Sequence, residues 1–591
     1  MYAYAVLWFI MSMVALATTA TLPFPAQRYA FSFAQPPYAD FQRFTSTCPQ
    51  DCDSKIFCEG ELLHDVQMAR IYPDSKTFVD KKLLFPEPEV ISKYQKLKND
   101  TGTPSVQQLK KFIDDNFEDD HIDVWLPPDF KDEPSIVNNI EDEVFKRWII
   151  DINKIWKQLG MKVSDDVKLN PELHSMLYMP NGFIKAGGRF REMYYWDSYW
   201  ILRGLLLSDM VDTARGIVEN IIWLVKLYGH MPNGSRKYYL QRSQPPLLIQ
   251  MAATYHSWTK DDNFIKTNIK YLDNEFQWWY QNRMVDVIKD GKTYKMARYN
   301  ASSCTPRPES YYEDYVLSMN LSTSNEKKRL FTGIKSAAES GWDFSSRHIR
   351  GPDDTNQGSL LDMDTPNIIF VDLNCILHAN AVVLSEWYRY FGNEVRSQYY
   401  KNIANKLFNA IENVLWNEEV GMWLDWDRQL QKSRNYFYAS NLTPLWTGSY
   451  SKKSSYVDKA IIYLLTQGII KFDFSPVYYG VPTSKENTTQ QWDYPNCWAP
   501  LQAIVIQGLE RTKHPIARYV AFKMAQNWVK TLYTGFSLHG FMYEKYSAIE
   551  LGVTGAGGEY NPQTGFGWTN GFLMEIFNTW GKFLKANEIV S

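Results

Sequence analysis

The segment GGRFREMYYWDSYW, residues 187–200, combines two glycines with a dense block of aromatic and charged side chains. Paired glycines permit a tight turn or a close backbone approach. The apolar run that follows, 199–207, has helical spacing, and Asp197 near its start would interact favourably with the positive end of the helix dipole. Arg189, Glu192 and Asp197 are costly to bury among aromatic rings unless they find partners. Rings that stack on C–H faces beside charged groups that bind hydroxyls are typical of sugar sites.

This segment resembles the first signature of the trehalases, inverting glycosidases that cleave α,α-trehalose, and QWDYPNCWAP, residues 491–500, resembles the second. Further similar segments run from 52–80, which is most similar to insect-type enzymes, to 555–560. The resemblance therefore extends over nearly the whole chain after its N-terminal segment, residues 1–20. It implies an all-α (α/α)6 toroid, a double barrel of six helical hairpins. It also implies a hydrolase that takes a small disaccharide, trehalose, and needs no cofactor.

Helical periodicity dominates the chain from about residue 143. One apolar stripe comprises Ala214, Ile217, Ile221, Leu224 and Tyr228. Counting similar stripes gives roughly a dozen helices and few convincing strands. Such helices could form a bundle, a solenoid or a ring of hairpins, and the lack of self-similarity at a period of about 34 to 45 residues disfavours the solenoid. The choice of the toroid rests on the resemblance.

We expect three regions in the chain. Residues 1–20 are largely apolar and uncharged and end in small side chains, which indicates a signal peptide. Residues 21–140 contain more proline and charge and are expected to form an N-terminal extension packed on the barrel. Residues 141–591 would form the catalytic domain. No other segment approaches the ~20 apolar residues that span a bilayer, so we expect a secreted, extracellular protein without a membrane anchor.

The bulk composition narrows the classes of partner. A net charge of −3 over 591 residues gives no reason to expect nucleic acid or an anionic membrane. The six cysteines are few for this length, and Cys52–Cys58 is one candidate disulfide among pairings that the sequence leaves open. A metal site is not expected, because the cysteine cluster has no histidine pair beside it and HExxH is missing. The oligomeric state stays open. Six glycosylation sequons agree with secretion: Asn99, Asn233, Asn300, Asn320, Asn441 and Asn487.

Two carboxylates are candidates for acid and base catalysis. Asp343 could cap a helix beginning at Phe344, but the resemblance implies that it is the general acid. The neighbouring Trp342 would favour its protonated form by desolvation. Glu544 beside Lys545 would, taken alone, be a solvated surface pair; the resemblance implies that it is the general base.

The resemblance also implies a set of sugar contacts in the loops. The local alternatives are a turn around Asn233 and a surface ion pair at Arg307. The glycine-rich segment 555–560 lacks the Gly-Lys-Ser/Thr of a phosphate-binding loop, and we interpret it as a mobile lid. The predicted substrate-binding residues are Arg189, Trp196, Asp197, Asn233, Arg242, Ser243, Gln244, Arg307, Pro308, Glu309, Gly341 and Glu559.

Together these residues predict a single-step inverting hydrolysis, in which Asp343 protonates the bridging oxygen while Glu544 takes a proton from water on the opposite face. That geometry needs carboxyl groups about 6.5–9.5 Å apart. Four departures from the family pattern bear on rate and lid behaviour rather than on reaction class: Ala186, His348, Cys497 and Ala556.

Two other functions are alternatives to trehalose hydrolysis. The first is a catalytically impaired trehalose-binding paralogue, and the intact Asp343 and Glu544 argue against it. The second is a related (α/α)6 glycosidase acting on maltose or starch ends, and the two signatures argue against that.

Overall fold

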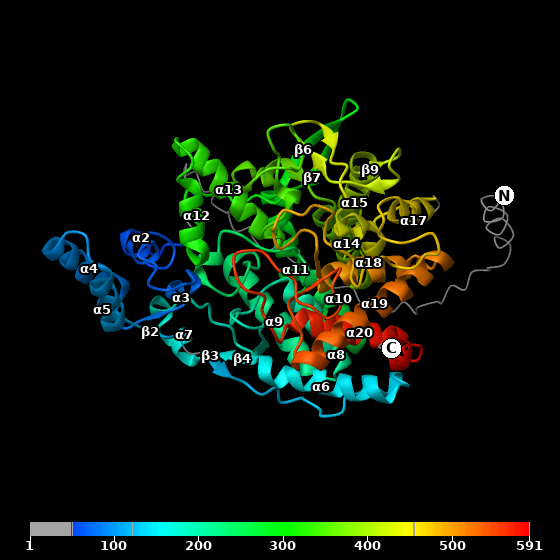
Figure 1. Cartoon of the computed structure of the whole chain (residues 1–591), viewed down its shortest axis with the longest axis horizontal. Helices are drawn as coiled ribbons and strands as arrows, with labels where there is room; N and C mark the ends of the chain where they lie inside the picture. The colour runs from blue at the N-terminus through cyan, green and yellow to red at the C-terminus, as the bar shows by residue number, and fades with distance from the viewer. Residues whose placement is uncertain (1–48, 50, 121, 453–454, 590–591) are drawn as a thin grey trace.

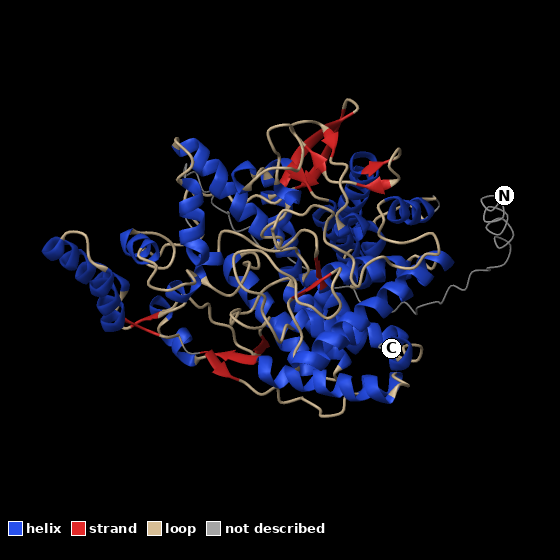
Figure 2. Ribbon diagram, in the orientation of Figure 1, coloured by secondary structure: helices blue, strands red, loops and turns tan. Residues whose placement is uncertain are grey.

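The structure is a computed structural model that describes residues 49, 51–120, 122–452 and 455–589 (Figure 1). The expected signal peptide, residues 1–20, and Cys48 lie outside the described residues. Helices make up most of the molecule and the strands are short (Figure 2). No helix in the described ranges combines the length and apolar character needed to cross a membrane.

Six helices of the described chain form a closed inner ring. In ring order each packs against the next, and the last packs against the first. Their bounds are α8 (Asp197–Leu207), α10 (Leu248–Thr259), α14 (Val371–Tyr390), α16 (Thr443–Thr447), α18 (Ala499–Arg511) and α20 (Gly567–Trp580).

Six further helices of the same ranges alternate with the inner ones along the chain and form the outer layer. They are α6 (Glu143–Leu159), α9 (Val211–Tyr228), α11 (Asp262–Asn282), α15 (Glu394–Ala410), α17 (Tyr456–Thr466) and α19 (Pro515–His539). The predicted (α/α)6 toroid is confirmed.

The sequence explains why the two layers form. In α9 the predicted stripe residues Ala214, Ile217, Ile221 and Leu224 are buried, as expected for the apolar face of a two-layer helix. The ring closes where α8 meets α20, and both helices carry a glycine there. A Cβ on Gly204 would lie 2.6 Å from the Cα of Gly571. Glycine at both positions therefore permits the close approach of the two backbones.

An insertion between α11 and α14 carries several predicted site residues. It comprises the antiparallel hairpin β6 (Met284–Lys289) and β7 (Lys292–Ala297), followed by α12 (Tyr311–Ser318) and α13 (Ser324–Ser340). The short strand β8 (Ile368–Ile369) immediately precedes α14. Four more short strands follow α15: β9 (Trp416–Asn417), β10 (Met422–Trp423), β11 (Trp426–Asp427) and β12 (Lys432–Ser433).

The antiparallel pair β13 (Asn496–Trp498) and β14 (Lys545–Ser547) brings two distant segments together. Trp498 pairs in register with Lys545. The second signature segment therefore lies beside Glu544, although neither strand is long enough to show a recognisable pattern in the sequence.

The N-terminal part, which precedes α6, is mostly helical and projects from one side of the molecule at α4 and α5 (Figure 1). Its helices are α2 (Glu61–Met68), α3 (Lys76–Val79), α4 (Glu87–Thr101) and α5 (Val106–Asn116), and its strands are β1 (Lys82–Leu83), β2 (Phe117–Glu118) and β3 (Ile122–Val124). The strand β1 pairs with β2, whereas β3 joins a sheet with β4 (Gly160–Val163) and β5 (Phe183–Ile184), which follow α6 together with the short helix α7 (Asp165–Leu169). The last helix of the described residues is α21 (Ala586–Ile589). The expected domain boundaries at residues 20 and 140 stay predictions.

The candidate disulfide Cys52–Cys58 is confirmed, with an S–S distance of 2.03 Å. Cys375 and Cys497 are buried free thiols.

Candidate active site

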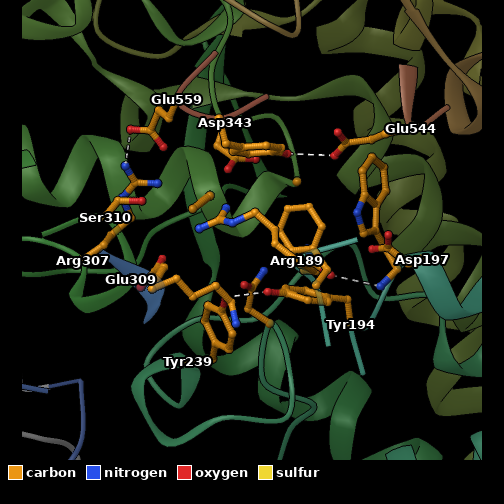
Figure 3. A pocket seen from close by; sticks show the side chains of 18 of the residues that line it. Arg189, Tyr194, Asp197, Tyr239, Arg307, Glu309, Ser310, Asp343, Glu544 and Glu559 are labelled. Carbon is orange, nitrogen blue, oxygen red and sulfur yellow. Dashed lines mark hydrogen bonds and ion pairs between the residues drawn. The ribbon is translucent and has the colours of Figure 1, made fainter. Parts of the chain in front are cut away.

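Figure 3 shows a pocket from close by. Its lining includes the N-terminal ends of two inner helices, since Asp197 begins α8 and Trp568 lies in the first turn of α20. Twelve of the fourteen predicted site residues line it: Arg189, Trp196, Asp197, Asn233, Arg242, Gln244, Arg307, Glu309, Gly341, Asp343, Glu544 and Glu559. They come from segments that are far apart in the chain. The structure thus brings most of the predicted set to one place, while the chemical role of each stays a prediction.

Ser243 and Pro308 do not line the pocket. The Ser243 hydroxyl donates a hydrogen bond to the Met231 carbonyl at 2.6 Å and is fully buried. The Pro308 carbonyl accepts from the Gln67 amide at 3.3 Å. Each is adjacent in the chain to a lining residue, Gln244 and Glu309 respectively.

Asp343 follows the C-terminus of α13, where Gly341 has a φ of +80°. A Cβ at Gly341 would lie 2.8 Å from the Trp196 ring, so only glycine fits both the backbone and the contact. No helix begins at Phe344; instead Ser345 caps a short 3₁₀ turn, Ser346–His348. The helix-cap alternative for Asp343 is therefore wrong, and its half-buried side chain faces the pocket.

The pKa of Asp343 is raised to about 6. Burial is the main cause, since it disfavours the charged carboxylate, and the positive charge of Arg307 opposes it. Asp197 has a pKa raised well above its usual range, by burial and then by the negative charges of Glu544 and Asp343. The negative charges of Glu544 and Asp343 thus disfavour the ionisation of Asp197 in the same pocket.

Glu544 immediately precedes β14 and is buried. Its Oε1 accepts a hydrogen bond from the Tyr560 hydroxyl at 2.8 Å, and its Oε2 accepts one from the Gln563 backbone N–H at 3.2 Å. Burial raises its pKa, while the charge of Lys545 and these donors oppose the rise. The solvated surface pair is wrong, because Lys545 is also buried and donates to the Gly557 carbonyl at 3.0 Å.

Three arginines surround the pocket in different states of pairing. Arg307 contacts Asp314 at 2.8 Å and Glu559 at 2.8 Å through the same nitrogen, Nη2. Arg189 forms two hydrogen bonds of 2.7 Å with Asp74 of the N-terminal part.

Arg242 donates one hydrogen bond, from Nη2 to Glu309. Its buried Nε and Nη1 have no hydrogen-bond partner within the described part of the chain. Unpaired buried donors are costly, so this arginine is ready to bind the oxygens of a ligand.

Figure 3 shows how the charged groups are arranged. In this view Arg307, Glu309 and Glu559 lie on one side of the pocket, Glu544 and Asp197 lie on the other, and Asp343 lies between them. Carboxyl groups from two different loops therefore face a common space, as acid/base catalysis requires.

Tryptophans form another part of the lining. Trp492 stacks on Trp498 with ring centroids 3.9 Å apart, and Trp196 lies 5.7 Å from Trp492. The Gln244 side chain accepts a hydrogen bond from the Trp196 backbone N–H at 3.1 Å. Apolar rings beside charged groups fit the C–H faces and hydroxyls of a sugar.

Sequence reasoning did not select eleven of the lining residues: Lys76, Phe190, Tyr194, Tyr239, Ser310, Ala338, Trp492, Trp498, Tyr560, Phe566 and Trp568. Phe190, Tyr194, Trp492 and Trp498 lie inside the two quoted signatures, so a signal for them was present. The four departures, Ala186, His348, Cys497 and Ala556, all lie outside the lining.

The glycine-rich loop 555–560 lies across the pocket and is tied to both sides of it, through Glu559 to Arg307 and through Tyr560 to Glu544. Asn496 holds Ala556 with two hydrogen bonds of 2.7 and 2.9 Å. The loop is therefore docked in this structure, and its mobility stays a prediction.

The chain is similar to a known protein family and to several of its members. The family model described as trehalase matches residues 70–581. The trehalase of Apis mellifera is 43% identical over 545 residues, which cover 91% of this chain and 86% of that protein. The trehalase of Pimpla hypochondriaca is 44% identical over 534 residues, 90% of each chain.

Among solved structures, the neutral trehalase of Saccharomyces cerevisiae has a TM-score of 0.53 at 24% identity. The match covers 67% of this chain and 73% of that one. At this level of identity the likeness supports the fold.

Proposed function

The chain belongs to the trehalase family and is an α,α-trehalase glycoside hydrolase, and from this premise we propose that it hydrolyses trehalose in one inverting step with Asp343 as general acid and Glu544 as general base. The Asp343 carboxyl group gives its proton to the bridging oxygen as the glycosidic C–O bond breaks. Glu544 takes a proton from the water that forms the new C–O bond on the opposite face. One water is consumed, and one α-glucose and one β-glucose leave.

The observation that carries the proposal is the contrast between two carboxyl groups in one pocket. Glu544 accepts hydrogen bonds on both oxygens, and such bonds favour the ionised form that a base needs. Asp343 has a pKa of about 6 and a half-buried position beside the tryptophans. Carboxylates whose environments differ in this way are suited to different roles in acid/base catalysis.

Substrate hydroxyls would bind to Arg242 and Glu309 in the pocket lining. The free Nε and Nη1 of Arg242 are donors without a partner in the described residues, and the buried Oε2 of Glu309 is an acceptor without one. A sugar hydroxyl both donates and accepts, so one hydroxyl pair could satisfy both residues.

Proton NMR of trehalose digestion, recorded before mutarotation, tests the mechanism. Equal early amounts of α- and β-glucose are expected. Release of α-glucose alone would indicate retention and overturn the acid/base assignment. Trehalose binding without cleavage would favour the impaired paralogue instead.

We also propose that the protein is secreted and glycosylated. The Cys52–Cys58 disulfide supports an oxidising compartment. Asn99, Asn320 and Asn487 are exposed and Asn300 is half-buried, so these sequons are accessible, whereas Asn233 and Asn441 are buried. Expression of the full chain in a eukaryotic host should release protein into the medium that loses mass on glycosidase treatment. Retention inside the cells, with no change in mass, would contradict the proposal.

A further inference from the structure

The mechanism above leaves unexplained a tyrosine that contacts the proposed base. Tyr560 lines the pocket, and its hydroxyl donates to Oε1 of Glu544 at 2.8 Å. The two residues belong to different segments, since Glu544 precedes β14 and Tyr560 ends the glycine-rich loop. We infer that Tyr560 is a positioning residue, which orients the Glu544 carboxylate for proton abstraction only when loop 555–560 is docked. The inference rests on the proposed role of Glu544 as base.

The two donors fix the plane of the carboxylate. Oε1 is held by Tyr560 and Oε2 by the Gln563 backbone N–H at 3.2 Å. Each ionised carboxylate oxygen has two lone pairs, so each keeps one that can accept a proton from water. The Gln563 segment is itself anchored, because its carbonyl accepts the Glu544 backbone N–H at 2.9 Å. Of the two donors, the phenol is the one that a side-chain substitution can remove.

The tyrosine ring is held so that its hydroxyl points to the base. The Arg189 guanidinium carbon lies 4.9 Å from the ring centroid, and the Phe190 ring packs against it at 5.3 Å with nearly perpendicular planes. Burial and the negative charge of Glu544 raise the pKa of Tyr560 well above its usual range. The phenol therefore stays protonated and remains a donor.

The position of Tyr560 depends on docking of the loop. Gly557 has a φ of +76°, and a Cβ there would collide with the Thr489 carbonyl oxygen. Lys545 donates to the Gly557 carbonyl at 3.0 Å, and Glu559 contacts Arg307 at 2.8 Å. A change that lifts the loop would remove both the Glu559 contact and the phenol from the pocket.

Other charges also act on Glu544. Lys545 favours its ionised form, and Asp343 disfavours it. Asp197 shares the same space, and Arg189 lies behind the Tyr560 ring. None of these groups is altered when the phenol oxygen is removed. A shift in the titration of the base in a Tyr560 variant is therefore attributable to the lost hydrogen bond.

Tyr560→Phe is the direct test. We expect kcat to fall about 10- to 100-fold, as it does when a hydrogen-bond partner that orients a metal ligand is lost, with KM changed less than about threefold. The acidic limb of kcat/KM should move to higher pH, because removing a donor to the carboxylate raises its pKa. A purely structural role would lower the melting temperature without moving that limb. A folded variant with unchanged kcat and an unmoved limb would overturn the inference.

Tyr456→Phe is the matched control. Its hydroxyl donates to Glu412 at 2.7 Å, the same phenol–carboxylate bond outside the pocket. We expect its kcat, KM and pH profile to equal those of the parent.

Gly557→Ala provides a second variant, which keeps the Tyr560 side chain chemically intact. It should undock the loop and move the acidic limb in the same direction as Tyr560→Phe. The double variant should show no further movement, because both changes remove the same bond. An additive movement would separate loop docking from base orientation and overturn the coupling.

Glu544→Gln, measured in parallel, separates this inference from the proposed function. Retained turnover in Glu544→Gln would remove the base assignment itself. An inactive Glu544→Gln together with a normal Tyr560→Phe would reject only the role of Tyr560.

Discussion

At the scale of single residues, Asp343 has a position that costs stability. Its pKa is raised to about 6 from an ordinary 3.8, mainly by burial. A carboxyl group with a raised folded-state pKa loses stabilisation as the pH rises from the unfolded value through the folded one. That window runs from about pH 4 to about pH 6, so at pH 7 the folded protein holds a carboxylate that its surroundings disfavour.

Asp343→Asn should therefore lower kcat by about 10²–10⁴-fold, the usual contribution of a general acid. Its melting temperature at pH 7 should be no lower than that of the parent, because the neutral amide avoids the cost of ionisation. Steady-state glucose release and thermal melting check both expectations.

Asp364→Asn is the control, since Asp364 also has a pKa raised by burial but lies outside the pocket. Its kcat/KM should be unchanged. Near-parental turnover in Asp343→Asn would remove the acid assignment.

The same residue predicts the alkaline limb of the pH profile. The general acid works only when protonated, and its protonated fraction falls as the pH rises through about 6. The value of kcat/KM should therefore decline about tenfold per pH unit above that point. A pH series with the purified enzyme measures the limb. If the residual kcat/KM of Asp343→Asn declined over the same pH range, the group that titrates there would not be Asp343.

At the scale of elements, the end of α13 determines where the acid lies. Gly341 combines a left-handed backbone with a contact to the Trp196 ring. Gly341→Ala should lower stability by about 1–3 kcal/mol, since backbone strain and overpacking add, and should lower kcat by displacing Asp343.

Gly540→Ala is the matched control for that change. Gly540 ends α19 with a φ of +75°, and a Cβ there meets no atom within 4 Å. It reports the backbone strain alone. Gly341→Ala should lower the melting temperature and kcat more than Gly540→Ala does. If the two variants had equal melting temperatures and equal kcat values, the contact of residue 341 with Trp196 would be unimportant.

Some elements were predictable from sequence and others were not. The stripe in α9 and a helix over 199–207, which α8 extends by two residues to Asp197, follow from local periodicity and helix-end chemistry. The pairing of β13 with β14 does not, because strands of three residues carry no period and their contact is long-range. For Asp343 and Glu544, the local alternatives of a helix cap and a surface pair were wrong. Only similarity to a family could identify them as pocket residues.

At the scale of the whole molecule, the periodicity predicts the helices but not their closure into a ring. Closure depends on the contact of α8 with α20, two helices near opposite ends of the barrel sequence. The contribution of the N-terminal part to the pocket could likewise not be predicted from the sequence. Asp74 holds Arg189, and Lys76 lines the pocket, yet no local pattern relates these residues to segment 187–200. The similarity of segment 52–80 to the family was visible in the sequence, but the position of Asp74 and Lys76 beside the pocket was not.

Lys76 also connects the N-terminal part to the barrel through buried charge. Its ammonium group lies 2.8 Å from the fully buried Glu192, which Arg236 also approaches at 3.4 Å. Lys76→Met removes one partner of Glu192, which keeps Arg236, and also breaks the ion pair of Lys76 with Asp80. Breaking a buried ion pair typically costs about 3–5 kcal/mol. We expect a clearly lower melting temperature in Lys76→Met and a partial recovery in Lys76→Met/Glu192→Gln, in which the negative charge of residue 192 is removed as well.

Lys111→Met is the control, because Lys111 and Asp115 form an exposed pair with a 2.8 Å contact. Exposed ion pairs contribute little to stability. If Lys76→Met melted like Lys111→Met, the buried pair would not hold the N-terminal part to the barrel, and apolar packing would have to do so.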